Sequence, residues 1–582
     1  MILQALNEYY ERKSSVENAR IPPPGFEWKA IDYILVVKSD GTLINIYTTL
    51  EGEGRSRRAK EYLVPQSVKK TVAIASNLLW ENPEYVLEIT TKGKVERIQE
   101  QHRAFIERIE ELKEIDDEGI QAIRAFLKKK SQELSKFPEK LKELSENARY
   151  ISFQLSGDTG LVIERPAVRK ALERLAKESK DNDDDICLVT GRRGKIERLH
   201  PAIKGVWGAQ TTGANIVSFN LKAFESYGKT QGANAPVSTE ATFSYTTALN
   251  HLLRKDSEQV LHVGDTTIVF WSKRASNLES QIPDFFGDIH NDDPDRRVHA
   301  VASLYQSIET GAIFIDEEKT NHFYVLGLAP NASRVSVRFW IVDTVTSMAQ
   351  KIYQHFKDFE IIHSSKDNPA ISLHHLLRSL AVQGKPENIP PKLAGEIVRA
   401  ALEERVYPFS ALQAAIRRIR AEHVVPHPRA ALIKACINRK SRYENLKSKE
   451  DLAMSLDENN SNIGYRLGRL FAVLERIQQA ANPGINATIR DKFYSAASGT
   501  PVTVFGNLMR LKNHHLAKLE NVGLKTYYEK AITNIMGGID AEGGFPAHLS
   551  LEDQGRFAVG YYHQMQDFFT KKANKPGGDE DE

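Results

Sequence analysis

Three glycine-rich loops contain the groups in this sequence that could bind a phosphate or a nucleobase. They span residues 187–195, 208–215 and 227–238. In the second loop, Gly208 and Gly213 have the spacing of a Walker phosphate-binding loop, but Ala214 follows where that loop requires a lysine. Because no lysine would reach a nucleotide phosphate, the sequence does not predict an ATP-binding site.

Amide side chains in and near these loops are the candidates for reading nucleic-acid bases. Glycine allows the backbone to approach a phosphate or a base closely, and amides match the donor and acceptor pattern of base edges. Gln231 and Asn234 lie in the third loop, and Asn77 follows a basic segment near the N-terminus. We therefore predict that Asn77, Gln231 and Asn234 contact base edges.

Two basic segments are the candidates for binding phosphates. Residues 55–70 have a net charge of +5, and residues 417–443 have a net charge of +7 with Glu422 as their single acid. Solvated loops or helix faces would also explain both segments, but such one-sided charge favours contact with a polyanion. The predicted contacts to the nucleic-acid backbone are Lys38, Arg57, Arg58, Lys69, Lys70, Arg417, Arg418, Arg420 and Lys434.

Groups that could perform catalysis or bind a metal are isolated in the sequence. The acidic turn 288–293 could ligate a metal, although acidic turns are far more often solvated. His374 and His375 are neighbours in a helical pattern, so they point about 100° apart and do not easily share one ion. Cys187 and Cys436 have no spaced partners, which excludes a zinc ribbon and a disulfide framework. We expect no enzyme activity, no metal and no cofactor.

The elements that would position these groups change in type along the chain. Residues 31–37 and 42–49 predict a hairpin around Asp40-Gly41. Residues 323–340 predict two strands around a turn, and strict alternation in the second strand places Val335, Val337 and Phe339 on one face. Before this point strand and helix patterns alternate, and after it nearly all patterns are helical.

The predicted fold class is α+β. A mixed α/β N-terminal region with a helical insertion precedes helical segments and a C-terminal α-helical bundle. The predicted domains are residues 1–350 (insertion at about 92–147), a basic helical region at 351–450, the bundle at 451–572 and a disordered acidic tail at 573–582.

Composition is typical of a globular protein that works in the cytoplasm. Of the 582 residues, 41% are hydrophobic and 27% are charged, and the net charge is only +3. Nucleic-acid binding must therefore depend on local patches. The two cysteines suit a reducing compartment, and the early apolar run 33–37 is too short to cross a bilayer.

A set of short stretches spread over nearly the whole chain matches one known family. The stretches are 64–65, 77–80, 85–87, 190–191, 200–205, 231–238, 248–250, 263–267, 269–271, 323–340, 418–420 and 429–435. Taken together, they resemble the large subunit of the type I-C CRISPR Cascade effector complex (the I-C branch of the Cas-eight family). One difference is that the family usually has Arg-Thr-Ser-Gly where this chain has residues 70–73 as Lys-Thr-Val-Ala.

The resemblance implies a subunit without catalytic activity that works in DNA surveillance. Such a subunit recognises the protospacer-adjacent motif (PAM) in double-stranded DNA, helps to form the R-loop and recruits a separate helicase-nuclease, while base pairing with guide RNA reads the target. Its partners are the guide RNA, the target DNA and the backbone, handle-binding and small subunits. The C-terminal bundle resembles the small subunit, which this family makes by internal initiation, and Met454 is the start that we predict.

Two alternatives remain open. The chain could be a structural scaffold that grips guide RNA without reading a motif. It could also be a nuclease or a helicase, although neither the paired metal-binding carboxylates nor the complete phosphate loop that these enzymes require is present in the sequence.

Overall fold

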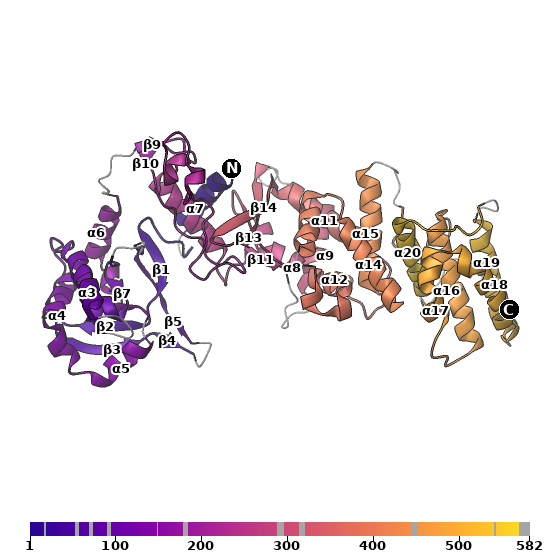
Figure 1. Cartoon of the computed structure of the whole chain (residues 1–582), viewed down its shortest axis with the longest axis horizontal. Helices are drawn as coiled ribbons and strands as arrows, with labels where there is room; N and C mark the ends of the chain where they lie inside the picture. Colours follow the sequence, from indigo (N-terminus) through magenta and orange to yellow (C-terminus); the bar gives the residue numbers. More distant parts are fainter. Residues whose placement is uncertain are drawn as a thin grey trace. The chain divides into compact units, whose positions relative to one another are not determined.

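The chain forms two compact units in the computed structural model (Figure 1). The first comprises residues 3–201 and 218–249, and the second comprises residues 202–217 and 250 onward. The structure describes residues 1–16, 19–52, 57–68, 74–89, 95–147, 149–177, 184–287, 296–312, 320–390, 392–444, 451–539 and 543–569.

A four-stranded sheet forms the centre of unit 1. Its strands are β3 (Leu43–Thr48), β2 (Tyr33–Val37), β8 (Ile151–Leu155) and β7 (Trp80–Glu81), in that order. Strands β2 and β8 are parallel, whereas the two outer pairs are antiparallel. The predicted β2–β3 hairpin is confirmed. Its turn requires glycine, because Gly41 has a φ of +82° and a Cβ there would lie 2.5 Å from the backbone nitrogen of Phe126.

Helices pack against this sheet through aromatic side chains. Phe105, Phe126 and Phe153 are fully buried, and the Phe153 ring lies 6.3 Å from that of Phe105 and 6.1 Å from that of Phe126. Asp117 accepts hydrogen bonds from the backbone of Gly119 and Ile120 and thereby caps helix α4. The helices are α2 (Pro83–Leu87), α3 (Val95–Glu110), α4 (Glu118–Leu134), α5 (Pro138–Asn147) and α6 (Pro166–Lys177).

The rest of unit 1 consists of small strand pairs, loops and two further helices. Helices α1 (Ile2–Ser14) and α7 (Thr239–Leu252) meet where the Tyr10 and Phe243 rings lie 5.7 Å apart. The antiparallel pairs are β1 (Phe26–Ala30) with β6 (Glu61–Pro65), β4 (Leu50–Glu51) with β5 (Arg58–Ala59), and β9 (Asp184–Ile186) with β10 (Arg193–Lys195).

Unit 2 begins with a four-stranded antiparallel sheet. The strands follow one another in sequence as β11 (Val260–Val263), β12 (Thr266–Ser272), β13 (His322–Asn331) and β14 (Arg334–Thr344). The predicted pair of strands within residues 323–340 is therefore present. Trp340 lies over Tyr324, with ring centroids 5.5 Å apart and planes 5° apart.

The prediction that side chains alternate strictly along β14 was wrong, because the strand contains a bulge. Gly327 pairs with Phe339, but Leu328 pairs with Val337, so Arg338 is an extra residue without a partner in the ladder. Val337 is consequently 40% exposed rather than buried with Val335 and Phe339. The pairing at Gly327 is tight, since a Cβ there would lie 2.5 Å from the Phe339 ring.

Helices build the remainder of unit 2, and their apolar faces share one core with the sheet. The helices that follow or flank the sheet are α8 (Leu278–Phe286), α9 (Arg296–Glu309), α11 (Val345–Phe359), α12 (Leu373–Leu380), α13 (Leu393–Glu403), α14 (Phe409–Glu422) and α15 (His427–Tyr443).

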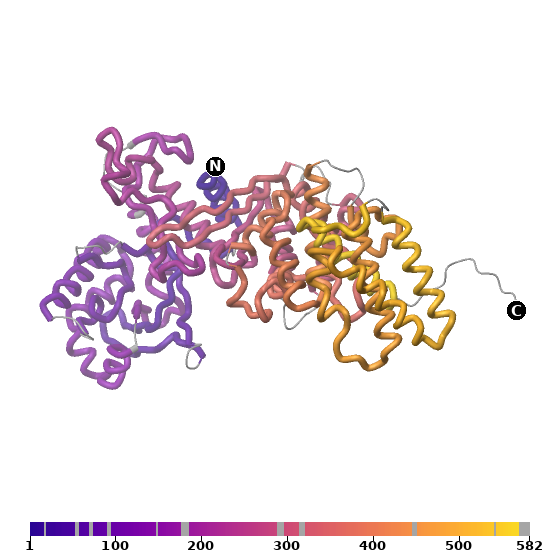
Figure 2. The backbone as a smooth tube through the Cα atoms, turned by 45° about the vertical axis from the view of Figure 1, so that its right-hand side comes forward, coloured from indigo at the N-terminus to yellow at the C-terminus, as the bar shows by residue number. Residues whose placement is uncertain are grey.

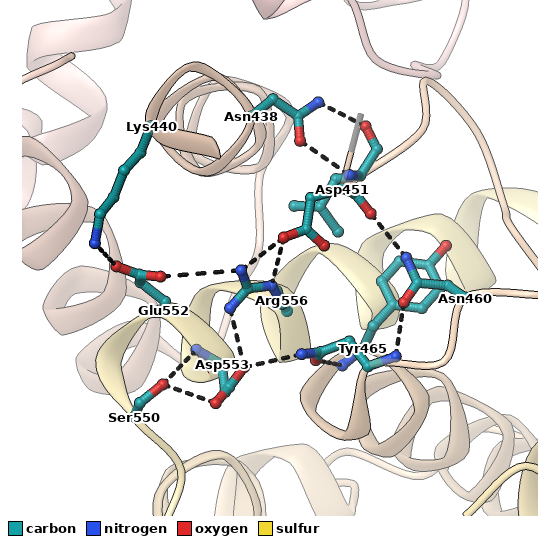
Figure 3. Close-up of polar contacts among 11 residues, drawn as sticks. Asn438, Lys440, Asp451, Asn460, Tyr465, Ser550, Glu552, Asp553 and Arg556 are labelled. Carbon is teal, nitrogen blue, oxygen red and sulfur yellow. Dashed lines mark hydrogen bonds and ion pairs between the residues drawn. The ribbon is translucent and has the colours of Figure 1, made fainter. Parts of the chain in front are cut away.

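The C-terminal helices form a bundle around α16, as Figure 2 shows in orange to yellow. Helix α20 also contacts α14 and α15, so the bundle is joined to the helices before it. Arg556 lies at this junction and pairs with Asp451 at 2.7 Å, while Lys440 pairs with Glu552 (Figure 3). The bundle comprises α16 (Ile463–Ala481), α17 (Ile489–Gly499), α18 (Val502–Ala517), α19 (Val522–Gly537) and α20 (Leu551–Phe569).

These elements confirm the α+β fold class, with small sheets in the N-terminal part and helices in the C-terminal part. The three helices α3, α4 and α5 lie where the helical insertion was predicted. The predicted acidic turn at 288–293 and the predicted tail at 573–582 lie outside the described residues.

Candidate nucleic-acid interface

Three of the predicted phosphate contacts lie at the surface of unit 1. Lys38 is exposed in the β2–β3 turn, where its backbone nitrogen donates to the Thr42 carbonyl. Arg57 and Arg58 are exposed, and Arg58 belongs to the short strand β5. Lys69 and Lys70 lie outside the described residues. The described cations can therefore approach a phosphate backbone without any rearrangement of the core.

Asn77 has a bracing role in this structure. It is 3% exposed, and its side-chain oxygen accepts a hydrogen bond from the Val68 backbone nitrogen at 2.9 Å. Its own backbone nitrogen donates to Glu81, which is fully buried. These bonds hold residue 68 beside the turn that precedes β7. A base could reach the Asn77 amide only if this turn opened.

Asn234 also braces its own loop. Its amide nitrogen donates to the carbonyl oxygens of Lys229 and Gln231, both at 3.0 Å, and its side-chain oxygen accepts from the Ser226 backbone at 3.1 Å. The side chain thus ties together a loop that carries another predicted base reader.

Gln231 is the predicted base reader with an unused acceptor. Its side-chain oxygen is shielded from solvent and has no hydrogen-bond partner among the described residues. The residue has a φ of +46°, a left-handed conformation that costs energy for a side chain larger than glycine. An unsatisfied acceptor in a strained loop is a group that a nucleobase donor can satisfy once the loop moves enough to expose it.

The loop also presents an aromatic residue that the sequence reasoning missed. Tyr227 is fully exposed at the tip of a tight turn closed by pairing between Ser226 and Lys229. Tyr227 and Gly228 both have positive φ, at 52° and 71°, which is the geometry of a type I′ turn. An exposed ring beside a lysine suits stacking on a base. The signal in the sequence was Tyr-Gly between polar residues, which is weak on its own.

The basic segment of unit 2 is largely neutralised within the protein. Arg417 and Arg420 are exposed on α14, whereas Arg418 is mostly buried and pairs with Glu422. Lys434 is 2% exposed and its ammonium donates to the Asp358 carbonyl at 3.2 Å. In this conformation Lys434 joins α15 to α11, so the surface cations of the segment are chiefly Arg417 and Arg420.

Two further arginines of this segment are bound to one buried acid. The fully buried Asp358 accepts from Arg439 at 2.6 Å and from Arg442 at 2.8 Å. Arg439 is 1% exposed and lies over the Tyr407 ring, 4.3 Å from its centroid. These guanidinium groups therefore serve the core rather than a polyanion.

Clusters of metal ligands and cysteine thiols are the other groups that could take part in chemistry. The described residues contain no group of three or more His, Cys, Asp or Glu side chains that could hold a metal ion. Cys436 is buried, and burial raises the pKa of its thiol to about 12. None of the described helices has the length and apolar character needed to cross a lipid bilayer.

Comparison with known proteins places the chain in one family. A search of curated proteins finds no match. The family model described as CRISPR-associated protein (Cas_Csd1) matches residues 6–569, which is nearly the whole chain and includes both units. The resemblance to a CRISPR-associated protein is thereby confirmed at the level of the family. The chain belongs to the CRISPR-associated protein family Cas_Csd1.

Proposed function

We propose that the chain is the non-catalytic large subunit of a type I-C CRISPR Cascade. In this role it recognises the protospacer-adjacent motif in double-stranded DNA, assists R-loop formation and recruits the helicase-nuclease. Its other partners are the guide RNA and the backbone, handle-binding and small subunits. The observation that carries the proposal is membership of a CRISPR-associated family over residues 6–569.

The candidate residues divide between motif reading and phosphate binding according to their surroundings. In unit 1, the unsatisfied acceptor of Gln231 supports base reading, and the exposed Lys38, Arg57 and Arg58 support backbone contacts. In unit 2, the exposed Arg417 and Arg420 support contact with the guide or the displaced strand. Asn77 and Asn234 would read bases only after releasing the bonds that now occupy their amides.

The experiment that tests this function is a binding series on the assembled complex. Duplexes with randomised trinucleotides beside the target would be ranked by affinity at one fixed salt concentration. A motif reader binds some flanks far more tightly than others, because each mismatched base pair costs about 1–3 kcal/mol. Equal affinity for every flank would overturn the proposal.

A structural scaffold is the second candidate, and one observation favours it. Two of the three predicted base readers, Asn77 and Asn234, already use their side-chain oxygens inside their own loops. A scaffold would bind guide RNA with the same cations and would ignore the flanking motif. The binding series separates the two functions, because only the scaffold gives affinities that do not depend on the flank.

Replacing Gln231 by alanine should change motif preference. Its side-chain oxygen is the acceptor that a base donor would satisfy. Its loss should therefore reduce the binding free energy by about 1–3 kcal/mol for duplexes with the preferred motif and by less for duplexes with other motifs. The measurement is the same flank series with the variant complex. Gln132→Ala removes an exposed amide from α4 and is the matched control. If the Gln231→Ala complex ranks the flanks in the same order as the parent complex, Gln231 does not read the motif.

Replacing Arg57 and Arg58 together by glutamine should weaken binding to all flanks alike. A phosphate contact has no sequence preference, and its loss lowers the slope of log K against log salt by about 0.9 for duplex DNA. We expect a slope reduction of about 1 to 2 for the pair. Lys128→Gln, which removes an exposed charge from α4, should leave the slope unchanged. If both variants behave alike, the two arginines do not touch the backbone.

A further inference from the structure

Unit 2 contains a pocket where three helices meet. Helix α12, the end of α14 and the start of α15 enclose a volume of about 570 Å³. Pockets for small ligands typically measure about 300–1,000 Å³, so this one has room for a phosphate together with its sugar. The lining includes Ser372, His374, His375, Arg378, Glu422 and Arg429.

Arg429 is a buried cation in this lining with an unused donor. The residue is 5% exposed, and its Nε donates to the Ser379 carbonyl at 2.7 Å. Its Nη2 pairs with Glu422. Its Nη1 is shielded from solvent and has no hydrogen-bond partner among the described residues. A buried guanidinium nitrogen without an acceptor is costly, and a phosphate oxygen is the acceptor that guanidinium geometry fits best.

Glu422 does not make the pocket repel an anion. Burial opposes ionisation of this carboxyl, but hydrogen bonds from Arg429 and Arg418 outweigh burial and lower its pKa. The carboxylate is therefore shared by two arginines. Three guanidinium groups, those of Arg378, Arg418 and Arg429, outnumber the two nearby acids, Glu422 and the Asp367 whose charge acts on His375, so the local charge remains positive.

Arg378 is held at the exposed side of the same pocket. Its Nε donates to the Gly384 carbonyl at 3.0 Å, which fixes the guanidinium against the turn after α12. Gln383 and Gly384 both have positive φ in this turn, at 58° and 63°. His374 and His375, both exposed, also line the pocket, although their positions on a helix suggested that they would point apart. Their imidazoles add hydrogen-bonding groups around a central anion.

We propose that this pocket binds one phosphodiester group of a single nucleic-acid strand, with Arg429 and Arg378 on its oxygens. A strand is favoured over a free phosphate because α14, which ends in the pocket at Glu422, also carries two exposed cations, Arg417 and Arg420, the second of which donates to Gln554 at 3.4 Å. Successive phosphates need successive cations, whereas one small anion does not. The inference rests on the proposed nucleic-acid function and adds a specific binding site to it.

The test uses the full-length chain and a fluorescein-labelled oligothymidylate. Anisotropy titrations over a range of salt concentrations give the affinity and the salt slope. Arg378→Gln is expected to weaken binding about tenfold and to reduce the slope by about 0.7, the value for one phosphate contact on a single strand. Arg429→Gln should act in the same way if hydrogen exchange shows that α15 remains folded. Lys530→Gln removes an exposed charge from α19 and should change neither quantity.

A parallel titration with inorganic pyrophosphate separates the two sources of a phosphate. If Arg378→Gln weakens the binding of both probes, the pocket recognises phosphate and accepts it from a strand. If pyrophosphate binding depends on Arg378 but oligothymidylate binding does not, a small free anion is the ligand and the proposal is wrong. If neither depends on Arg378 or Arg429, the pocket is not a phosphate site, although motif-dependent duplex binding by the parent complex would still uphold the proposed function.

Discussion

Replacing Asp358 by alanine is expected to destabilise unit 2 by about 3–5 kcal/mol, because it leaves a buried charge without its counter-ion. Asp358 in α11 is fully buried, and Arg439 in α15 is 1% exposed. Their contact at 2.6 Å joins two helices of the shared core. Arg442 is partly exposed and can turn to water, but Arg439 cannot. The measurement is hydrogen exchange of α11 and α15 peptides in urea, which reports on unit 2 separately from unit 1.

A surface ion pair of the same chain provides the matched control. Asp256 pairs with Arg254 at 2.6 Å, but its side chain is 65% exposed. Asp256→Ala should therefore cost only about 0–1 kcal/mol. Adding Arg439→Met to Asp358→Ala should restore part of the lost stability, because it removes the uncompensated charge. Equal effects of Asp358→Ala and Asp256→Ala would show that the buried pair does not stabilise the core.

The Asp358 cluster also shows why the charge of the basic segment 417–443, counted along the sequence, is larger than the charge that the segment presents at the surface. A net charge of +7 in the sequence counts only neighbours along the chain, and Asp358 lies 81 residues before Arg439. Likewise Lys440 pairs with Glu552, which is 112 residues later. These acids reach the basic helix only through tertiary contacts, which a count of charges along the sequence does not include. Even the exposed Arg420 has a long-range contact, because its Nη1 donates to Gln554 at 3.4 Å, 134 residues later. The sequence therefore does not separate the exposed Arg417 and Arg420 from the buried Arg439.

Local features were predictable because they depend on neighbouring residues. The hairpin at Gly41 follows from turn chemistry, and helices α16–α20 follow from apolar spacing. The bulge at Arg338 was not predictable, because it depends on how the Phe339 ring packs against Gly327 on the neighbouring strand. For the same reason, the sequence showed that Asn234 is in a glycine-rich loop but could not show that its amide braces that loop.

The location of Met454 supports the internal start that we propose. Four other internal methionines, Met348, Met509, Met536 and Met565, lie within helices α11, α18, α19 and α20. Initiation at any of these would cut an element in two. Met454 is 55% exposed and lies between α15 and α16. A product beginning there contains the five helices α16–α20 intact.

Such a product would differ from the bundle in the full chain at one junction. Asp451, Asn438 and Lys440 precede Met454, whereas Arg556 and Glu552 follow it (Figure 3). The separate product would therefore lose the partners that hold α20 against α15. The bundle keeps its own core around Phe471, whose ring lies 5.9 Å from Phe557 and 5.8 Å from Tyr494. The separate product would keep this core but would expose the α20 face that packs against α14 and α15, including Gly555, which lies beside Leu412, Ile433 and Ile437.

Changing Met454 to alanine should abolish a separate product while leaving the full chain in place. Initiation at this codon gives 129 of the 582 residues, about 14 kDa by its share of the 65.6 kDa chain. Because the side chain is exposed, Met454→Ala should change the stability of the full chain by no more than about 0.5 kcal/mol. The measurement is an immunoblot for a C-terminal tag, with Ser455→Ala as a neighbouring exposed substitution that keeps the codon. Loss of the 14 kDa band together with an unchanged full chain is the result that initiation at Met454 predicts. A 14 kDa band that persists in Met454→Ala would show that the start lies elsewhere or that the band is a proteolytic fragment.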